Sequence, residues 1–229
     1  MLNIKRIVVN PLQENCYLLW NEAGNGVILD PGCIDEAERD RLATCFLRER
    51  ITPKEIWLTH GHFDHVFGVA ALVREHSLTV RMAPEDSETL RANLQLTRQF
   101  GLPAPDGKFA CEPLSDGQRL AFPGSPAEPA FQVIATPGHT PGGVCFYDAA
   151  DKVLFSGDTL FAGSIGRTDH PGGDYDKLIV SIMDKLMGLP GDVDVLPGHG
   201  PRTSIGRERT RNPFLEPFNE PEEEGMENG

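Results

Sequence analysis

The sequence has no long hydrophobic run and relatively few basic residues. No stretch approaches the roughly 18 consecutive apolar residues of a membrane-spanning helix, which excludes a simple transmembrane segment. The start of the chain lacks the apolar core and small-residue cleavage site of a signal peptide, so the expected location is the cytoplasm. Basic residues number 21 against 34 acidic ones, giving a net charge of −13. Without a basic stripe or an interleaved aromatic platform, nucleic acid is not expected as a partner.

Cysteine is also scarce and irregularly spaced. The five cysteines do not form the pattern of a disulfide framework, which agrees with a reducing compartment. Cys16, Cys45 and Cys145 stand in apolar surroundings and are expected to be buried. A chain of 229 residues with 39% hydrophobic content is long enough for one domain with a substantial core. We place this domain at residues 1–214 and expect residues 215–229, which are rich in glutamate, to be a disordered acidic tail.

The most informative segment is Thr-His-Gly-His-Phe-Asp-His at positions 59–65. Imidazole nitrogens and carboxylate oxygens are ligands that zinc and iron accept readily. A polar surface loop that happens to contain histidine is the alternative for any one of these residues. Four potential ligands within six positions favour a metal site instead, and these are His60, His62, Asp64 and His65.

Three later segments supply matching ligands, each beside glycine. His139 lies in 136–143, Asp158 in 155–160 and His199 in 196–201, and each segment follows a short apolar run. Such runs predict buried strands, and loops at strand ends are where α/β proteins build functional sites. We therefore expect the four loops to converge. Two histidines remain, His76 and His170, for which structural roles are expected.

The apolar periodicity predicts alternating strands and helices. Strands are expected over 4–9, 16–20, 26–30, 55–58, 80–83, 131–135, 152–155 and 193–196. Helices are expected over 35–50, 66–76, 85–100, 174–187 and 205–211. Residues 101–129, with six prolines and four glycines, predict an irregular connection with one short strand near 119–122. This order suggests two packed sheets with helices outside them.

The motifs at 59–65, His139, Asp158 and His199, in that order, resemble those of the metallo-β-lactamase superfamily. The resemblance implies an α/β protein with a four-layer αββα sandwich and a two-metal site at one edge. It implies two divalent ions, zinc first, with iron or manganese as alternatives. The implied ligands are His60, His62 and His139 for the first ion, Asp64, His65 and His199 for the second, and Asp158 as the bridge.

The segment 158–169 is similar to the glyoxalase II branch, whose members hydrolyse S-lactoylglutathione. The segment 198–214 resembles the short bacterial type, without the C-terminal helical domain and with Gly200-Pro201 where full-length members have a tyrosine. The resemblance implies a metal-dependent thioester hydrolase, in which a hydroxide shared by the two ions attacks a small-molecule thioester. Asp64 and Asp158 would be its catalytic carboxylates. Arg167 would contact a substrate carboxylate, or else pair with Asp169.

Two other functions fit the same residues. A persulfide dioxygenase would use one iron held by His60, His139 and Asp158, the open facial triad of non-haem iron oxygenases. A non-enzymatic binding module would use metal only to stabilise its fold. The segment 197–201 favours the hydrolase over the dioxygenase. A thiolate can leave without a general acid and no spare acid stands in these motifs, so a thioester is favoured over a lactam.

Overall fold

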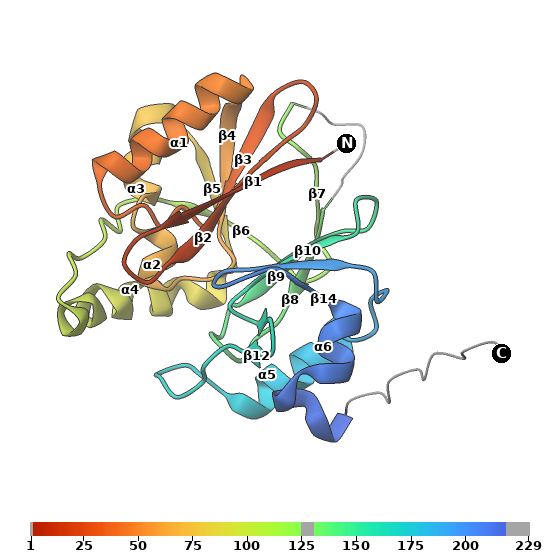
Figure 1. Ribbon diagram of the computed structural model, residues 1–229. Helices are drawn as coiled ribbons and strands as arrows, with labels where there is room; N and C mark the ends of the chain where they lie inside the picture. Colours follow the sequence, from red (N-terminus) through yellow and green to blue (C-terminus); the bar gives the residue numbers. More distant parts are fainter. Residues whose placement is uncertain (1, 125–130, 219–229) are drawn as a thin grey trace.

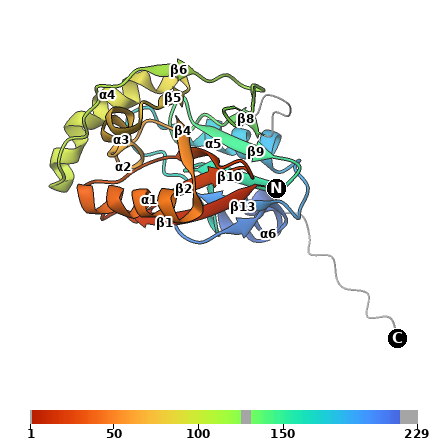
Figure 2. The same ribbon diagram turned by 90° about the horizontal axis from the view of Figure 1, so that it is seen from above.

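Two six-stranded sheets pack face to face between two layers of helices (Figure 1). The structure is a computed structural model that describes residues 2–124 and 131–218. Helices α1 and α3 cover the outer face of the first sheet, and α5 and α6 cover the outer face of the second (Figure 1). Helices α2 and α4 lie together at one end of the molecule (Figure 2). The expected αββα sandwich is confirmed.

The first sheet is built from the N-terminal half of the chain. Its strands β1 to β3 form an antiparallel meander, and β3 to β6 are parallel. Side chains of β2 alternate between two cores, because Cys16 and Leu18 face the helices whereas Tyr17 and Leu19 face the second sheet. The strands are β1 (Asn3–Val9), β2 (Glu14–Trp20), β3 (Asn25–Leu29), β4 (Thr52–Trp57), β5 (Thr79–Met82) and β6 (Cys111–Pro113).

The helices of this half connect the parallel strands. The N-terminus of α1 is capped by Asp35, whose side chain accepts a hydrogen bond from the backbone N–H of Glu38. The helix ends where Arg50 adopts a left-handed conformation with φ of 56°. The helices are α1 (Glu36–Glu49), α2 (Phe63–Val66), α3 (Val69–His76) and α4 (Ser87–Leu96), with 3₁₀ turns at Pro84–Asp86 and Thr97–Phe100.

The second sheet comes from the C-terminal half. Strands β10 and β13 are parallel, and its other pairs are antiparallel. Its strands are β7 (Arg119–Leu120), β8 (Phe131–Ala135), β9 (Val144–Asp148), β10 (Val153–Gly157), β13 (Asp194–Pro197) and β14 (Thr203–Ser204). A small hairpin, β11 (Leu160–Phe161) and β12 (Ser164–Ile165), follows β10. The helices are α5 (Tyr175–Ser181), which continues as a π-helix over Ile182–Leu186, α6 (Ile205–Arg211) and the 3₁₀ helix Pro213–Phe218.

An aromatic cluster fills the space between the sheets. The Trp57 ring lies 5.3 Å from that of Phe146 and 5.1 Å from that of Phe131, centroid to centroid. Phe155 joins them from β10, and all four side chains are buried. The three cysteines expected in the interior, Cys16, Cys45 and Cys145, are buried as well. Tyr17 and Phe122 belong to the same buried core between the sheets.

Several element boundaries differ from the sequence-based expectation. Of the helix expected over 66–76, Val66 is the last residue of α2 and Val69–His76 form α3; Gly68 lies in the turn between them, and its N–H donates to the Pro31 carbonyl oxygen at 2.9 Å. The helix expected over 85–100 is likewise divided into a 3₁₀ turn, α4 and a second 3₁₀ turn. Strands β6, β9, β11, β12 and β14 were not individually expected.

The expected acidic tail lies partly within the described chain. Residues 215–218 belong to the last 3₁₀ helix, and Leu215 is 1% exposed in the core beneath α5 and α6. The remainder of the tail, 219–229, lies outside the described residues.

None of the helices within 2–124 and 131–218 combines the length and the apolar character that crossing a bilayer requires.

Candidate metal centre

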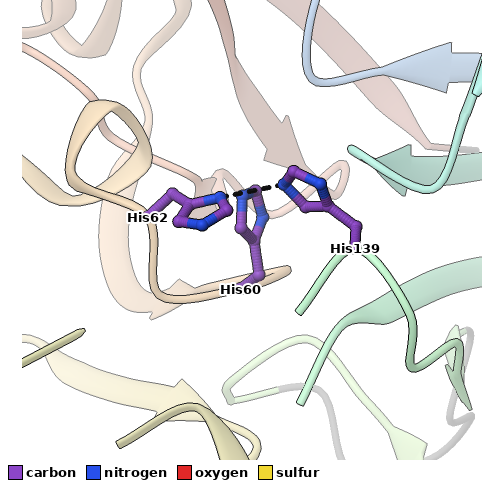
Figure 3. A group of neighbouring side chains, drawn as sticks. All are labelled: His60, His62 and His139. Atoms are coloured by element: carbon purple, nitrogen blue, oxygen red, sulfur yellow. Dashed lines mark hydrogen bonds between the residues drawn. The ribbon is translucent and has the colours of Figure 1, made fainter. Parts of the chain in front are cut away.

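The seven predicted ligands converge at one edge of the sandwich, and six of them form two groups of three. Within each group the ligand atoms lie within 4.8 Å of one another. Figure 3 shows the first group, in which His62 Nδ1 and His139 Nε2 are 2.9 Å apart above the ring of His60. The first group is His60, His62 and His139, and the second is Asp64, His65 and His199.

The carboxylate of Asp158 lies between the two groups. Its Oδ1 is 3.5 Å from His65 Nε2, in the second group. Its Oδ2 is 3.6 Å from His139 Nε2 in the first group and 3.7 Å from His199 Nε2 in the second. Asp158 follows β10 directly, so the rigid strand fixes the position of this carboxylate. The arrangement is the one that a bridging ligand requires.

Four of the five histidines are oriented by a hydrogen bond at Nδ1, which leaves Nε2 for the site. His139 Nδ1 lies 2.8 Å from the Arg167 carbonyl oxygen, and His199 Nδ1 lies 3.1 Å from that of Leu12. The carbonyls can only accept, so both Nδ1 atoms donate. His60 Nδ1 is 3.0 Å from Thr59 Oγ1, and His65 Nδ1 is 3.1 Å from Asp30 Oδ2. Such outer contacts fix the tautomer and ring orientation of metal-binding histidines.

The residues fit a pair of divalent ions. His60 Nε2, His65 Nε2 and Asp158 Oδ1 are all covered from solvent and have no hydrogen-bond partner within the protein. Buried polar atoms are nearly always hydrogen-bonded, so three such atoms at one site indicate a missing partner. A set of imidazole nitrogens and carboxylate oxygens suits zinc, iron or manganese.

The two groups differ in their electrostatics. Burial lowers the pKa of His60, His62 and His139, and neighbouring imidazoles lower it further, so these rings are neutral at neutral pH. Burial also favours the neutral form of His65 and His199, which by itself would lower the pKa of both. For these two the carboxylates of Asp158 and Asp64 outweigh burial and raise the pKa.

The same contacts lower the pKa of the Asp158 carboxylate. Burial favours its neutral form, but the charge of His65, whose Nε2 lies 3.5 Å from Asp158 Oδ1, outweighs burial and holds the pKa of Asp158 well below the usual range. Asp158 is therefore ionised at neutral pH and available to a cation.

Metal loading is expected to release protons mainly from the second group. A raised histidine pKa means that His65 and His199 keep their protons to a higher pH than the histidines of the first group, and a ligand must lose that proton to bind metal. The first group binds as neutral imidazole. Affinity at the second group should therefore weaken as pH falls, and more steeply than at the first. Calorimetric titration of zinc in buffers of different ionisation enthalpy measures the protons released at each step, and equal release at both would contradict the assignment.

Asp30 contacts the candidate site and was not among the residues predicted from the sequence. It is 2% exposed and adopts a left-handed conformation with φ of 47°. Its Oδ1 accepts from the Thr59 N–H at 2.7 Å, and its Oδ2 accepts from Thr59 Oγ1 at 2.6 Å and from His65 Nδ1. One carboxylate thus orients the start of the ligand loop and a ligand of the second group.

Replacing Asp30 with asparagine is expected to weaken metal binding at the second group by about 10- to 100-fold, the usual cost of losing such a supporting contact. An amide cannot accept all three of these hydrogen bonds, so the His65 ring loses its fixed orientation. Competition with a fluorescent zinc chelator measures the affinities. Asp40→Ala, at an exposed site in α1, is the control, and equal affinities in both variants would refute the role of Asp30.

Asp86 links the two loops of the first group and was also missed. This carboxylate is fully buried and accepts from the N–H of Gly61 at 2.6 Å and from that of Gly142 at 2.7 Å. It also accepts from Thr140 Oγ1 at 2.9 Å. Gly61 separates His60 from His62, and Thr140 follows His139. These three partners lie 25 to 56 residues away along the chain, and the one local contact, from Thr89 Oγ1 at 3.4 Å, does not mark the residue in the sequence.

A third contact holds the loop that carries His199. Asn15 and Tyr17 from β2 both donate side-chain hydrogen bonds to the Pro197 carbonyl oxygen, each at 2.8 Å. The Asn15 backbone N–H donates to the Gly198 carbonyl oxygen at 2.7 Å. The first sheet therefore supports a ligand that belongs to the second sheet.

A cavity of about 620 Å³ adjoins the metal centre. Five of the seven predicted ligands line it, together with Arg167, Asp169 and His170. Arg167 Nε lies 2.7 Å from Asp169 Oδ1, and a second bond joins the two side chains at 3.1 Å. The pairing expected as the alternative for Arg167 is thus present, at an exposed position. His170 packs edge-on against His62, with ring centroids 4.8 Å apart.

Comparison with known proteins agrees with this geometry. The sequence profile of the metallo-beta-lactamase superfamily matches residues 9–199. Hydroxyacylglutathione hydrolase GloC of Haemophilus influenzae is 39% identical over 93% of this chain and 98% of its own length.

Two solved structures are similar over nearly the whole chain. The BLEG-1 B3 metallo-beta-lactamase has a TM-score of 0.83 and 40% identity, covering 93% of this chain and 99% of its own. TTHA1623 in a di-iron-bound form has a TM-score of 0.82 and 42% identity, covering 92% and 100%.

Fold and relatives together indicate a metal-dependent hydrolase, and the histidine and aspartate groups of the site could hold the metal. The chain belongs to the metallo-β-lactamase superfamily.

Proposed function

We propose that this protein hydrolyses thioesters, with S-lactoylglutathione or a related hydroxyacyl thioester as substrate. The observation that carries the proposal is the Asp158 carboxylate between two ligand groups beside a cavity of about 620 Å³. Similarity to a hydroxyacylglutathione hydrolase over 93% of the chain supports the choice of substrate.

The proposed roles follow from the position of each side chain. A pair of divalent ions, when bound, lowers the pKa of a shared water and polarises a carbonyl oxygen. His60, His62 and His139 would hold one ion, Asp64, His65 and His199 the other, and Asp158 would contact both. Asp64 Oδ2, which lies 3.2 Å from His199 Nε2, would also orient the attacking water.

The leaving group fits the residues around the cavity. Asp169 is a carboxylate of the lining outside the ligand set, and its hydrogen bond from Arg167 lowers its pKa. It is therefore ionised at neutral pH and cannot donate a proton to a departing group. A thiolate leaves without such donation, whereas an amine expelled from an amide or a lactam is helped by it.

Arg167 is proposed to contact a carboxylate of the substrate. Its guanidinium is bound to Asp169 on the exposed rim of the cavity, and a substrate carboxylate could replace that partner in the same paired geometry. Arg167→Ala is expected to raise KM for S-lactoylglutathione about tenfold with kcat nearly unchanged, the loss of one charge-assisted contact. Steady-state kinetics test this, and an unchanged KM removes Arg167 from the binding site.

The function is tested by assaying the metal-loaded protein with three substrates in parallel. Thiol release from S-lactoylglutathione is the expected result. Oxygen uptake with glutathione persulfide would instead favour the mononuclear iron dioxygenase, and ring opening of a chromogenic cephalosporin would favour a lactamase. Metal content is measured on the same sample. If no substrate reacts and the chelated protein unfolds, the metal has only a structural role.

A further inference from the structure

One wall of the cavity is apolar and directly adjoins the metal ligands. Phe63 stands between His62 and Asp64 in the sequence and is itself 7% exposed. Its ring lies 5.4 Å from that of Phe100, centroid to centroid. Leu96, four residues before Phe100, lines the same cavity. An apolar surface therefore extends outward from the place where the substrate carbonyl must lie.

Phe100 is exposed in a way that suggests a ligand. It is 52% exposed although its other face packs on Phe63. A large apolar side chain at the rim of a cavity is typical of a ligand-binding surface. On the side of His199, Leu12 and Phe161 also line the cavity, and the Phe161 ring lies 6.4 Å from that of His199.

The charges of the lining restrict what can bind against this wall. Among the described residues of the lining, Arg167 is the one lysine or arginine, and Asp169 already neutralises it. Asp64 and Asp158 add negative charge at the centre. In natural thioesters the charged groups belong to the thiol carrier, glutathione or coenzyme A. The carrier is therefore the part of the substrate that suits contact with Arg167. The apolar wall that includes Phe63 and Phe100 therefore suits the uncharged part of the substrate, which is the acyl group.

We propose that this site prefers thioesters whose acyl group is a straight, uncharged hydrocarbon chain longer than lactoyl, with the chain packed on Phe63, Leu96 and Phe100. The proposal rests on the proposed thioester hydrolysis and specifies its substrate class. Burying one methylene group changes an equilibrium or rate ratio by up to about fourfold. Going from acetyl to butyryl adds two methylene groups, so kcat/KM should rise roughly tenfold.

The test compares acetyl, butyryl and hexanoyl thioesters of glutathione with S-lactoylglutathione. In the native protein, kcat/KM is expected to increase along the series. Phe100→Ala should reduce the ratio of hexanoyl to acetyl kcat/KM at least about fivefold, because the chain loses its outer contact surface. Phe100→Glu should reduce it further. Leu47→Ala, which removes an exposed leucine of α1 that is not part of the cavity lining, should leave the ratio unchanged.

A binding measurement separates contact with the acyl chain from the rate of hydrolysis. S-methyl- and S-hexylglutathione cannot be hydrolysed, and calorimetry should show tighter binding of the hexyl compound to the native protein and a smaller difference between the two compounds in Phe100→Ala. A series that falls with chain length, or a ratio unaffected by Phe100→Ala, overturns the acyl-chain proposal while hydrolysis of S-lactoylglutathione still stands. Failure of every thioester overturns the proposed function instead. Metal content of each variant confirms that the centre is intact.

Discussion

Replacing Asp158 with alanine is expected to abolish binding of the ion pair and to lower thioester turnover by at least about 10³-fold, the cost of losing a principal electrostatic stabiliser. The reason is geometric. Asp158 is the carboxylate within 3.7 Å of ligand nitrogens in both groups. Its removal takes away one of the two carboxylate charges, the other being Asp64, that draw a cation into the second group. Elemental analysis after dialysis and single-turnover kinetics measure the two effects.

The matched variant Asp158→Asn keeps the shape of the side chain and removes its charge. It is expected to retain the fold and part of the metal at the first group, but to lose the second ion. Asp184→Ala, at an exposed position, is the neutral control and should match the native protein. Full metal content and full rate in Asp158→Ala would show that the bridge is wrongly assigned.

Asp86→Ala should lower the free energy of unfolding of the metal-free protein by about 3 kcal/mol or more, since it leaves buried N–H donors unpaired. The backbone N–H groups of Gly61 and Gly142 and the hydroxyl of Thr140 all lose their acceptor. The first ligand group should also lose affinity, because these donors belong to the two loops that carry it. Urea unfolding after chelation measures the stability.

Two further variants serve as comparisons for Asp86→Ala. Asp86→Asn retains one acceptor oxygen and places an NH₂ group against a backbone donor, so an intermediate loss is expected. Glu88→Ala changes an exposed acid on the next turn and should alter stability by less than about 0.5 kcal/mol. A native-like unfolding curve for Asp86→Ala would mean that the loops are held by other contacts.

That the candidate ligands lie together could be predicted because their signal is local. Four ligands fall within 59–65, and the others stand beside glycines after apolar runs that do form strands β8, β10 and β13. The two-sheet arrangement followed from the order of those runs and from the family resemblance. Predicting that the loops converge required only that strand ends meet at one edge.

The supporting carboxylates could not be predicted, because their partners are distant along the chain. Asp30 contacts Thr59 and His65, and Asp86 reaches Gly142 across 56 residues. Nothing in the sequence beside either aspartate distinguishes it from an ordinary loop residue. The division at Gly68 has a similar origin, since the Pro31 carbonyl that approaches it comes from another loop.

Each ligand group draws on both halves of the sandwich. His60 and His62 follow β4 of the first sheet, whereas His139 follows β8 of the second; Asp64 and His65 likewise face His199. An ion in either group would therefore link two layers that also meet through the aromatic cluster and through hydrogen bonds such as those from Asn15 and Tyr17 to the Pro197 carbonyl oxygen. Metal binding would then raise the free energy of unfolding, and the increase would grow with the logarithm of the free metal concentration. The metal centre would then stabilise the domain as well as supply its chemistry. Loss of metal would lower the free energy of unfolding as well as stop turnover.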